Sequence, residues 1–289
     1  MNELNDFIQE KSAVINQALD CLLPAETVQP QRLHAAMRYS IFAGGKRLRP
    51  LLCLAAAEAC GGKESDAMHA ACAVEMLHTY TLIHDDLPAL DDDELRRGRP
   101  ACHIQFGEAT AILAGDALLT LSFEILAGIP QAGTALVLEL ARAAGSCGVI
   151  GGQMIDIESE GKTPDAETVN YIHRNKTAAL IRAACTLGGI CAGGSPAELE
   201  KLAEFGENIG LAFQLTDDLL DERASVAQLG KNTGVDKARG KITWPAVYGV
   251  EKTEADARQM ELAALDALKI FPAPERLRQL AHFIIRRNF

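Results

Sequence analysis

The sequence predicts an all-α protein, with residues 1–289 forming a single domain. Helix-start signals recur along the chain. In Thr163-Pro164-Asp165 and Ser195-Pro196-Ala197-Glu198 a hydroxyl residue precedes a proline, and acid follows in the first turn. Long segments with helical apolar periodicity follow both signals. β-branched residues are sparse and alternation does not persist, so no segment is expected to be a strand.

The expected helices share this apolar periodicity and are separated by glycine-containing turns, which we interpret as connections between helices and not as domain linkers. All-helical folds with a large central cavity can use a chain of 289 residues in one domain. The expected helices lie near residues 3–20, 31–42, 48–60, 66–87, 108–126, 131–147, 165–187, 196–220, 253–269 and 274–287.

Composition and charge narrow the possible functions. With 48% hydrophobic and 23% charged residues, the chain has the composition of a soluble globular protein with a substantial core. A net charge of −11 argues against non-specific nucleic-acid binding. The basic residues form short clusters, which favours small anionic ligands. These clusters are Lys46-Arg47-Leu48-Arg49, Arg96-Arg97-Gly98-Arg99 and Arg286-Arg287.

Cysteine usage and the N-terminus predict a cytoplasmic protein. The eight cysteines include no Cys-x-x-Cys pair and mostly stand among Ala and Leu, as expected of reduced core thiols. The first residues have neither the basic start nor the apolar core of a signal peptide. No run is expected to reach the roughly 20 apolar residues of a membrane span.

Two aspartate clusters each follow an apolar, helix-patterned stretch. The first covers Asp85 to Asp93 and the second covers Asp217 to Asp221. A helix C-terminus carries partial negative charge, so acids there need a positive partner. Asp217 and Asp221 are four residues apart and share a helix face, with Asp218 nearby. Clustered carboxylates of this kind suit Mg²⁺, which commonly bridges carboxylates to substrate phosphates.

Three other interpretations of these acids account less well for the pattern. Asp91 to Asp93, taken alone, are more typical of a solvated surface turn. Calcium binding is disfavoured because the EF-hand spacing and its central glycine are absent. Glycoside hydrolysis needs one acid and one base, not five clustered aspartates. A metal-bridged diphosphate therefore accounts best for the pattern.

Several motifs together resemble the trans-isoprenyl diphosphate synthases, and most closely the bacterial farnesyl diphosphate synthases. The resemblance covers about residues 40 to 250. The residues that carry it are Gly44-Gly45-Lys46-Arg47-Leu48-Arg49-Pro50, His78, Leu82-Ile83-His84 with the D-D-x-x-x-x-D motif from Asp85 to Asp91, Leu95-Arg96-Arg97-Gly98-Arg99-Pro100, Gly152-Gln153, Lys176-Thr177, Gln214-Leu215-Thr216-Asp217-Asp218-Leu219-Leu220-Asp221, Gly230-Lys231 and Gly240-Lys241.

The resemblance implies an isoprenoid-synthase-type helical bundle around a deep central cavity, with the two aspartate motifs facing each other across its mouth. It also implies condensation of isopentenyl diphosphate with dimethylallyl or geranyl diphosphate, through an allylic carbocation, to give farnesyl diphosphate. Three Mg²⁺ ions are expected, held by Asp85, Asp91 and Asp217. A homodimer is expected as well.

The resemblance assigns roles to individual residues. The catalytic set would be Asp85, Asp86, Asp91, Asp217, Asp218, Lys176 and Lys231. The allylic diphosphate would be bound by Arg96, Lys176, Thr177, Gln214, Lys231 and Lys241. Isopentenyl diphosphate would be bound by Gly45, Lys46, Arg49, His78 and Arg97.

The identity of the third acid in the first motif stays open between two residues. In an unbroken helix Asp85 would share a face with Asp92, seven residues on, and not with Asp91. Pro88 can alter the path of the chain between them. By resemblance we choose Asp91.

Product length is predicted from Tyr80 and Thr81, which stand five and four residues before Asp85. In the family a bulky aromatic at the position of Tyr80 closes the cavity, which implies a fifteen-carbon product. A geranylgeranyl or geranyl diphosphate synthase, a terpene cyclase and a non-catalytic partner subunit are the alternatives. Lys46, Arg49 and Arg97, as elements of an isopentenyl diphosphate site, argue against the cyclase.

Overall fold

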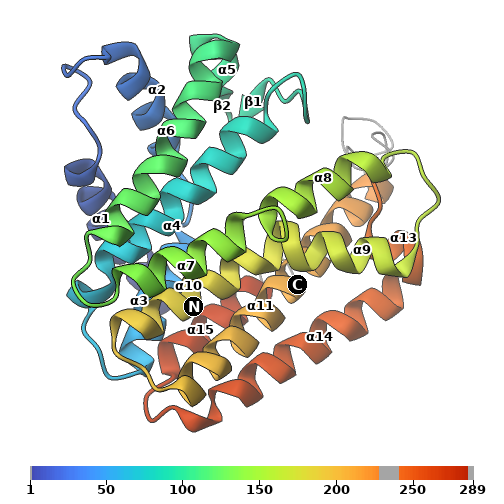
Figure 1. Ribbon diagram of the computed structural model, residues 1–289. Helices are drawn as coiled ribbons and strands as arrows, with labels where there is room; N and C mark the ends of the chain where they lie inside the picture. Colours follow the sequence, from blue (N-terminus) through green and yellow to red (C-terminus); the bar gives the residue numbers. More distant parts are fainter. Residues whose placement is uncertain (1, 228–240, 286–289) are drawn as a thin grey trace.

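A computed structural model describes residues 2–227 and 241–285, and within them the protein is a bundle of helices (Figure 1). In chain order the elements are α1 (Asn2–Leu22), α2 (Gln31–Ile41), α3 (Leu48–Ala59), α4 (Glu64–Asp85), β1 (Leu95–Arg96), β2 (Arg99–Pro100), α5 (Cys102–Phe106), α6 (Glu108–Ala127), α7 (Gly133–Ala144), α8 (Val149–Ser159), α9 (Ala166–Ile172), the π-helical segment η1 (His173–Ala178), α10 (Ala179–Cys191), α11 (Pro196–Ala227), α13 (Trp244–Tyr248), α14 (Val250–Ala267), the 3₁₀ turn η2 (Leu268–Ile270) and α15 (Glu275–Ile285). The all-α prediction is confirmed.

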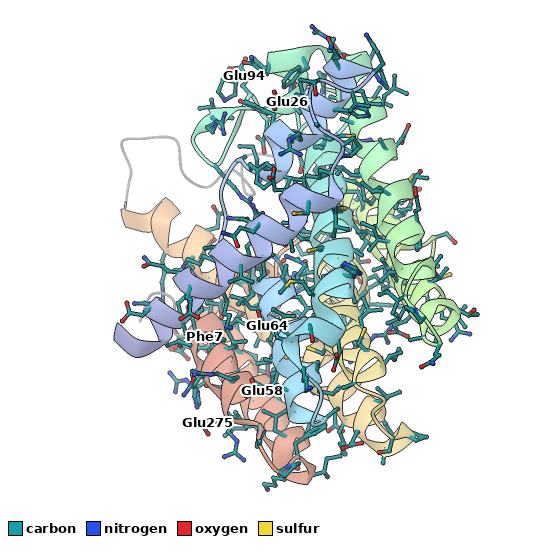
Figure 2. All side chains as sticks on the ribbon, turned by 90° about the vertical axis from the view of Figure 1, so that its left-hand side faces the viewer. Phe7, Glu26, Glu58, Glu64, Glu94 and Glu275 are labelled. Atoms are coloured by element: carbon teal, nitrogen blue, oxygen red, sulfur yellow. The ribbon has the colours of Figure 1, made fainter. Side chains whose placement is uncertain are left out.

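Helix α4 lies at the centre of the bundle and carries the first aspartate motif at its C-terminal end. It packs against α3, α6 and α10, and its side chains are buried around most of its circumference. A helix that is apolar nearly all round is expected to be enclosed in this way. Figure 2 labels Glu64, the first residue of α4, in the lower half of the view and Glu94, beyond the motif, at the top. The helix therefore runs from the middle part of the molecule toward its upper end in this view.

The prediction that no strand is present is wrong at one place. Leu95 pairs with Pro100 and Arg96 with Arg99 in a short antiparallel hairpin. Its two turn residues, Arg97 and Gly98, both have positive φ, at 53° and 75°. Positive φ at both positions is what a two-residue hairpin turn requires. Two-residue strands are too short to produce an alternating sequence pattern.

Helix α8 is not among the expected helices, and it contains Gly151 and Gly152, which have low intrinsic helix propensity. The structure gives Gly152 a packing role. A Cβ at this position would collide with the backbone nitrogen of Lys176, so the missing side chain is what allows α8 and η1 to approach closely. Helix α13 was also not expected, and the long helix predicted over 165–187 is divided into α9, η1 and α10.

Two helical stretches are long and apolar enough to cross a membrane by length and composition alone, contrary to the expectation from the sequence. They are Glu108–Ala127, with 33% of its most apolar window buried, and Gly133–Ser159, with 39% buried. In this fold α6 packs against α4 and α2, and α7 packs against α10. The apolar character is therefore partly explained by the core, and the remaining apolar surface is exposed.

Lys231 and the C-terminal residues Arg286 and Arg287 lie outside the described residues, so the roles predicted for them receive no structural account.

Candidate active site

The main cavity, of about 460 Å³, opens between α4, α8, η1, α10 and α11. Its lining combines an apolar wall with a polar mouth. Leu180, Met154 and Phe213 belong to the wall, whereas Asp85 and Lys176 belong to the mouth. A mostly apolar cavity with a few convergent polar groups is typical of a small-molecule site.

The first aspartate motif is brought together by a turn and not by helical spacing. Helix α4 ends at Asp85, and the Asp91 N–H donates a hydrogen bond to the Asp85 carbonyl oxygen at 2.8 Å. The side chain of Asp91 is 14% exposed, whereas Asp92 is exposed and has a positive φ of 52°. Because the helix stops at Asp85, the seven-residue helical spacing that favoured Asp92 does not apply.

Asp85 lies in surroundings that disfavour its negative charge. Burial raises its pKa to about 6, and the Asp91 carboxylate adds to the increase, while the Lys176 ammonium opposes it. A carboxylate in this situation is stabilised by a nearby cation. This is the setting that the prediction of a metal ligand requires.

Asp86 and Arg96, which were assigned to catalysis and to the allylic diphosphate, are paired with each other. Asp86 is buried, and Arg96 donates to its Oδ1 through Nε at 2.9 Å and through a second guanidinium nitrogen. Arg96 also lies 3.4 Å from Asp93. The pair ties the hairpin to the end of α4, so both side chains already have a partner within the protein.

The π-helical segment η1 presents Lys176 and Thr177 to the cavity. Such segments add one residue to a turn and are frequent at functional sites. The Thr177 hydroxyl donates to Gln214 Oε1 at 2.7 Å, and Gln214 Nε2 donates to Asp218 Oδ1 at 2.9 Å. These contacts join η1 to the second aspartate motif on α11.

Asp218 is buried and serves as a structural anchor. Its Oδ2 accepts a hydrogen bond from the Trp244 backbone N–H at 2.8 Å and lies 3.3 Å from His173 Nε2. The His173 ring stacks on the Trp244 ring, with centroids 5.5 Å apart. Asp217, its neighbour on α11, is only partly buried. The structure therefore separates the two acids, with Asp218 holding the segment that follows Lys241.

Asp156 is a site residue that was not predicted from the sequence. It is buried on α8 and accepts hydrogen bonds from Lys176 Nζ at 2.6 Å and Lys241 Nζ at 2.8 Å. Lys241 also donates to Asp91 Oδ1 at 3.0 Å. Burial alone would raise the pKa of Asp156, but the two ammonium groups outweigh it and hold the pKa below its usual range. A lone acid within the apolar run from Val149 to Ile157 was the available signal.

The residues expected to bind isopentenyl diphosphate gather around the loop between α2 and α3. Gly44 and Gly45 have φ of 101° and 117°. A Cβ on Gly45 would lie 2.6 Å from the Arg97 guanidinium carbon, and Arg97 donates to the Gly44 carbonyl oxygen. Glycine is therefore needed for Arg97 to lie against the loop. Arg49 and His78 line the main cavity.

Lys46 and His78 each have surroundings that bear on their expected roles. Lys46 Nζ lies 4.8 Å from the centre of the Phe283 ring on α15. Burial and the neighbouring arginines, beginning with Arg49, hold the pKa of His78 well below its ordinary value. His78 is therefore neutral at neutral pH and can donate or accept a hydrogen bond.

Arg47 anchors the loop between α2 and α3 through its buried side chain. It has a positive φ of 50°, and its side chain is 1% exposed. The guanidinium donates to Glu75 Oε1 at 2.7 Å, Asn16 Oδ1 at 2.9 Å and the Ile41 carbonyl oxygen at 2.6 Å. A buried arginine with all three contacts fixes a strained backbone position between Lys46 and Arg49.

The protein side chains at the cavity mouth supply only some of the ligands that a magnesium ion needs. Within residues 2–227 and 241–285 no three acidic, histidine or cysteine side chains come close enough to enclose a metal. Asp85 and Asp91 supply hard oxygen donors at the cavity mouth. Mg²⁺ commonly uses one or two carboxylates and completes its shell with water and substrate phosphates. The residues present therefore fit a magnesium ion that is shared with a diphosphate.

Tyr80 and Thr81 both line the cavity on α4. Tyr80 is 5% exposed, and its ring meets the His84 ring edge to face at a centroid distance of 5.3 Å. His84 is itself held by the Ile112 carbonyl oxygen at 3.0 Å. The tyrosine is therefore a fixed part of the cavity wall.

The fold and this charged cavity mouth are those of an enzyme that binds phosphorylated substrates with a metal. Comparison with known proteins shows that the chain belongs to the polyprenyl synthetase family, whose sequence profile matches residues 30–278. It is a prenyltransferase of isoprenoid biosynthesis that elongates prenyl diphosphates. The family implies Mg²⁺-dependent catalysis and the use of isopentenyl and allylic diphosphates.

Individual relatives differ in the product that their names state. The chain is 46% identical to the large subunit 1 of a heterodimeric geranylgeranyl pyrophosphate synthase of Arabidopsis thaliana, over 98% of this chain and 79% of the relative. Its structure resembles a geranylgeranyl pyrophosphate synthetase of Pyrococcus horikoshii, with a TM-score of 0.91, 32% identity and 99% of both chains covered. It also resembles an FPP/GFPP synthase of Zymomonas mobilis, with a TM-score of 0.87, 34% identity and coverage of 98% and 99%. The expected isoprenoid synthase fold is confirmed.

We predict that Asp156→Asn weakens the binding of the allylic substrate, because both lysines lose the shared carboxylate that positions them. The KM for the allylic diphosphate should rise roughly tenfold, with a smaller change in the KM for isopentenyl diphosphate. Steady-state kinetics with each substrate varied in turn measures the two constants. Glu158→Gln, an exposed acid on the same helix, is the matched control. Equal KM values for Asp156→Asn and the control would contradict the positioning role.

We predict that Glu75→Gln affects the KM for isopentenyl diphosphate more than the KM for the allylic substrate, the reverse of Asp156→Asn. In this variant Arg47 keeps its buried charge but loses its carboxylate partner. Unfolding free energy should fall by about 3 kcal/mol, and the KM for isopentenyl diphosphate should rise more than that of the allylic substrate. Chemical denaturation and the same kinetic assay measure these effects. Glu58→Gln, an exposed acid on α3, controls for the loss of charge. A loss of stability without a selective change in KM would show that Glu75 has only a structural role.

Proposed function

We propose that this chain condenses isopentenyl diphosphate with an allylic diphosphate of five or ten carbons by ionising the allylic carbon–oxygen bond. The observation that carries the proposal is the arrangement at the cavity mouth. Two lysine ammonium groups share Asp156 directly beside Asp85 and Asp91, next to a mostly apolar cavity that Tyr80 helps to line. Negative charge can be bound at the mouth while a hydrocarbon chain extends inward.

The residues at the mouth would stabilise the leaving diphosphate. Ionisation produces a carbocation and a diphosphate, so the barrier falls when cationic groups are already in place around the departing oxygens. Lys176 and Lys241 supply fixed positive charge, and Thr177 and Gln214 supply hydrogen bonds. A bound magnesium ion would add Lewis-acid stabilisation of the same oxygens. Asp85 and Asp91 would hold it, with Asp217 as the predicted ligand on the opposite helix.

The second substrate would lie against the loop between α2 and α3. Lys46, Arg49 and Arg97, together with the neutral His78, can bind a second diphosphate whose double bond points toward the allylic cation. The arginines are suited to this because a planar guanidinium can grip two phosphate oxygens at once. No side-chain base is needed, since the released diphosphate can accept the proton lost in the final step.

Two products compete for the final assignment. The relatives at 43–47% identity are named as geranylgeranyl pyrophosphate synthases, which favours a twenty-carbon product. The phenol ring of Tyr80 within the cavity wall favours the fifteen-carbon product expected from the sequence. We propose geranylgeranyl diphosphate, which the names of the relatives favour, as the first candidate, and farnesyl diphosphate, which Tyr80 favours, as the second.

The proposed assembly is a homodimer through the exposed apolar surface of α6 and α7. Ile112 and Leu113 on α6 are 43% and 57% exposed, and Leu138 on α7 is 48% exposed. Burying such side chains against another subunit is favourable. A relative is named as the large subunit of a heterodimer, so a small-subunit partner is the alternative occupant of this surface. A cytoplasmic location stays a prediction from the sequence.

We predict that the purified chain converts geranyl diphosphate and isopentenyl diphosphate into a longer prenyl diphosphate when Mg²⁺ is present, and that chelation by EDTA stops the reaction. The measurement is chromatography of dephosphorylated products by chain length. Restoring Mg²⁺ after chelation controls for irreversible loss of the fold. No metal-dependent elongation of any allylic substrate would refute the proposed function.

We predict that Tyr80→Ala lengthens the main product by at least one five-carbon unit, because removing the ring opens the cavity wall along α4. The product profiles of the wild type, Tyr80→Ala and Tyr80→Phe are compared at equal conversion. The phenylalanine variant keeps the ring and should retain the wild-type profile. An identical profile for wild type and Tyr80→Ala would remove Tyr80 as the determinant of length and leave the twenty-carbon candidate favoured by the relatives.

A further inference from the structure

A second cavity, of about 150 Å³, lies behind the active site between the end of α7, the start of α8, η1, α10 and α11. It shares no lining residue with the main cavity. Its charged lining residues are three arginines, Arg142, Arg174 and Arg182, and one acid, Glu207. On a protein of net charge −11 this is a local excess of positive charge.

Two of the three arginines have no acidic partner among the residues that the structure describes. Glu207 pairs with Arg174, which also donates to Asn170 Oδ1 at 3.1 Å. Over the described ranges no carboxylate pairs with Arg142 or Arg182. Arg182 is partly buried on the otherwise apolar helix α10, and its Nε is enclosed without a hydrogen-bond acceptor. An enclosed guanidinium N–H without an acceptor is costly, so an anion that accepts a hydrogen bond from Nε would explain this residue.

The N-terminus of α8 adds partial positive charge at the edge of this cavity. Gly148, which lines the cavity, is the N-cap of this 11-residue helix. It offers no side-chain cap, and no acid stands in the first turn of α8. The first backbone N–H groups of a helix lack internal acceptors and carry partial positive charge. They reinforce the arginines.

We propose that this cavity binds a phosphate-class oxyanion, either inorganic phosphate or the diphosphate that prenyl transfer releases. Guanidinium groups bind such anions through paired N–H donors, and donors that reach the cavity from several elements suit an anion with several oxygens. Arg182 from α10, Arg142 from α7 and the N-terminus of α8 surround the space. Asn175 adds an amide on the η1 side.

The site is connected to the active site through η1. Arg174 and Asn175 line the second cavity, while the next two residues, Lys176 and Thr177, line the main one. An anion bound behind η1 therefore holds the segment that carries Lys176. The expected consequence is a more rigid π-helical segment when the second cavity is filled.

Titration calorimetry with inorganic phosphate in EDTA, followed by a parallel titration with inorganic diphosphate, tests the site. The wild type is compared with Arg142→Gln/Arg182→Met and with Arg258→Gln, an exposed arginine on α14 that serves as the control for charge. We expect the affinity of the second cavity for the anion to fall about tenfold or more in the double variant. The affinity should stay unchanged in the Arg258→Gln control. Equal binding by all three proteins would overturn the proposal. The anion that binds with higher affinity shows whether phosphate or diphosphate is the ligand of the second cavity.

Crystals of the full chain soaked in tungstate, a tetrahedral oxyanion located by its anomalous signal, identify where the anion lies. Density between Arg142 and Arg182 supports the proposal, and tungstate confined to the main cavity refutes it. Should the double variant fail to fold, the exposed Arg142→Gln variant replaces it. Hydrogen exchange at residues 173–178 should then slow with phosphate in the wild type and in Arg258→Gln but not in Arg142→Gln. Initial rates without added phosphate, measured before released diphosphate accumulates, should be unchanged in Arg142→Gln, so a failure here is distinct from a failure of the proposed function.

Discussion

The contact on which the cavity mouth depends is the sharing of one buried carboxylate by two ammonium groups. Asp156 accepts from Lys176 and from Lys241, which belong to segments 65 residues apart along the chain and are brought together only by the fold. Each lysine alone would extend into solvent, because its side-chain entropy and hydration favour exposure. The buried acid reverses that preference and holds two positive charges beside Asp85 and Asp91. Electrostatic preorganisation of this kind removes reorganisation from the chemical step.

Packing makes this arrangement possible. Asp156 can reach Lys176 only because α8 lies directly against η1, and the missing side chain of Gly152 permits that approach. The extra residue in the π-helical turn then points Lys176 and Thr177 toward the cavity, while Thr177, Gln214 and Asp218 link the segment to α11. Asp218 in turn holds Trp244, three residues after Lys241. The two lysines are thus linked directly through Asp156. The segments that carry them are also linked through Thr177, Gln214, Asp218 and Trp244.

Much of the fold could be predicted from the sequence, because long apolar periodicity and proline-containing helix starts depend on local physics. The existence of α4, α6 and α11 followed from that pattern. Helix α8 could not be predicted, since its glycines are unfavourable in a helix and are explained only by a neighbour distant in sequence. The hairpin Leu95–Pro100 could not be predicted either, because two-residue strands are too short to show an alternating pattern. Local signals fail wherever a tertiary contact decides the outcome.

The candidate site shows the same division between local and tertiary information. The family motifs identified Asp85, Lys176 and Lys241; the first two line the main cavity, and Lys241 contacts Asp91 and Asp156. Motifs could not show that Asp86 is paired with Arg96, or that Asp218 anchors Trp244, because both facts concern partners and not residue type. Asp156 was missed because a single acid in an apolar helix has no motif of its own.

The sign of the charge around η1 extends this argument to the proposed second site. On the side of the main cavity, Lys176 and Lys241 share Asp156, and Arg96 is paired with Asp86. On the other side, Arg174 alone has an acidic partner, while Arg142 and Arg182 face the same small space without a described counter-charge. A substrate anion must displace or bridge existing pairs at the active site, whereas an anion behind η1 would meet cations that need no displacement. An anion that binds on the main-cavity side of η1 must therefore break or bridge existing ion pairs. An anion in the second cavity can bind Arg142 and Arg182 without breaking one.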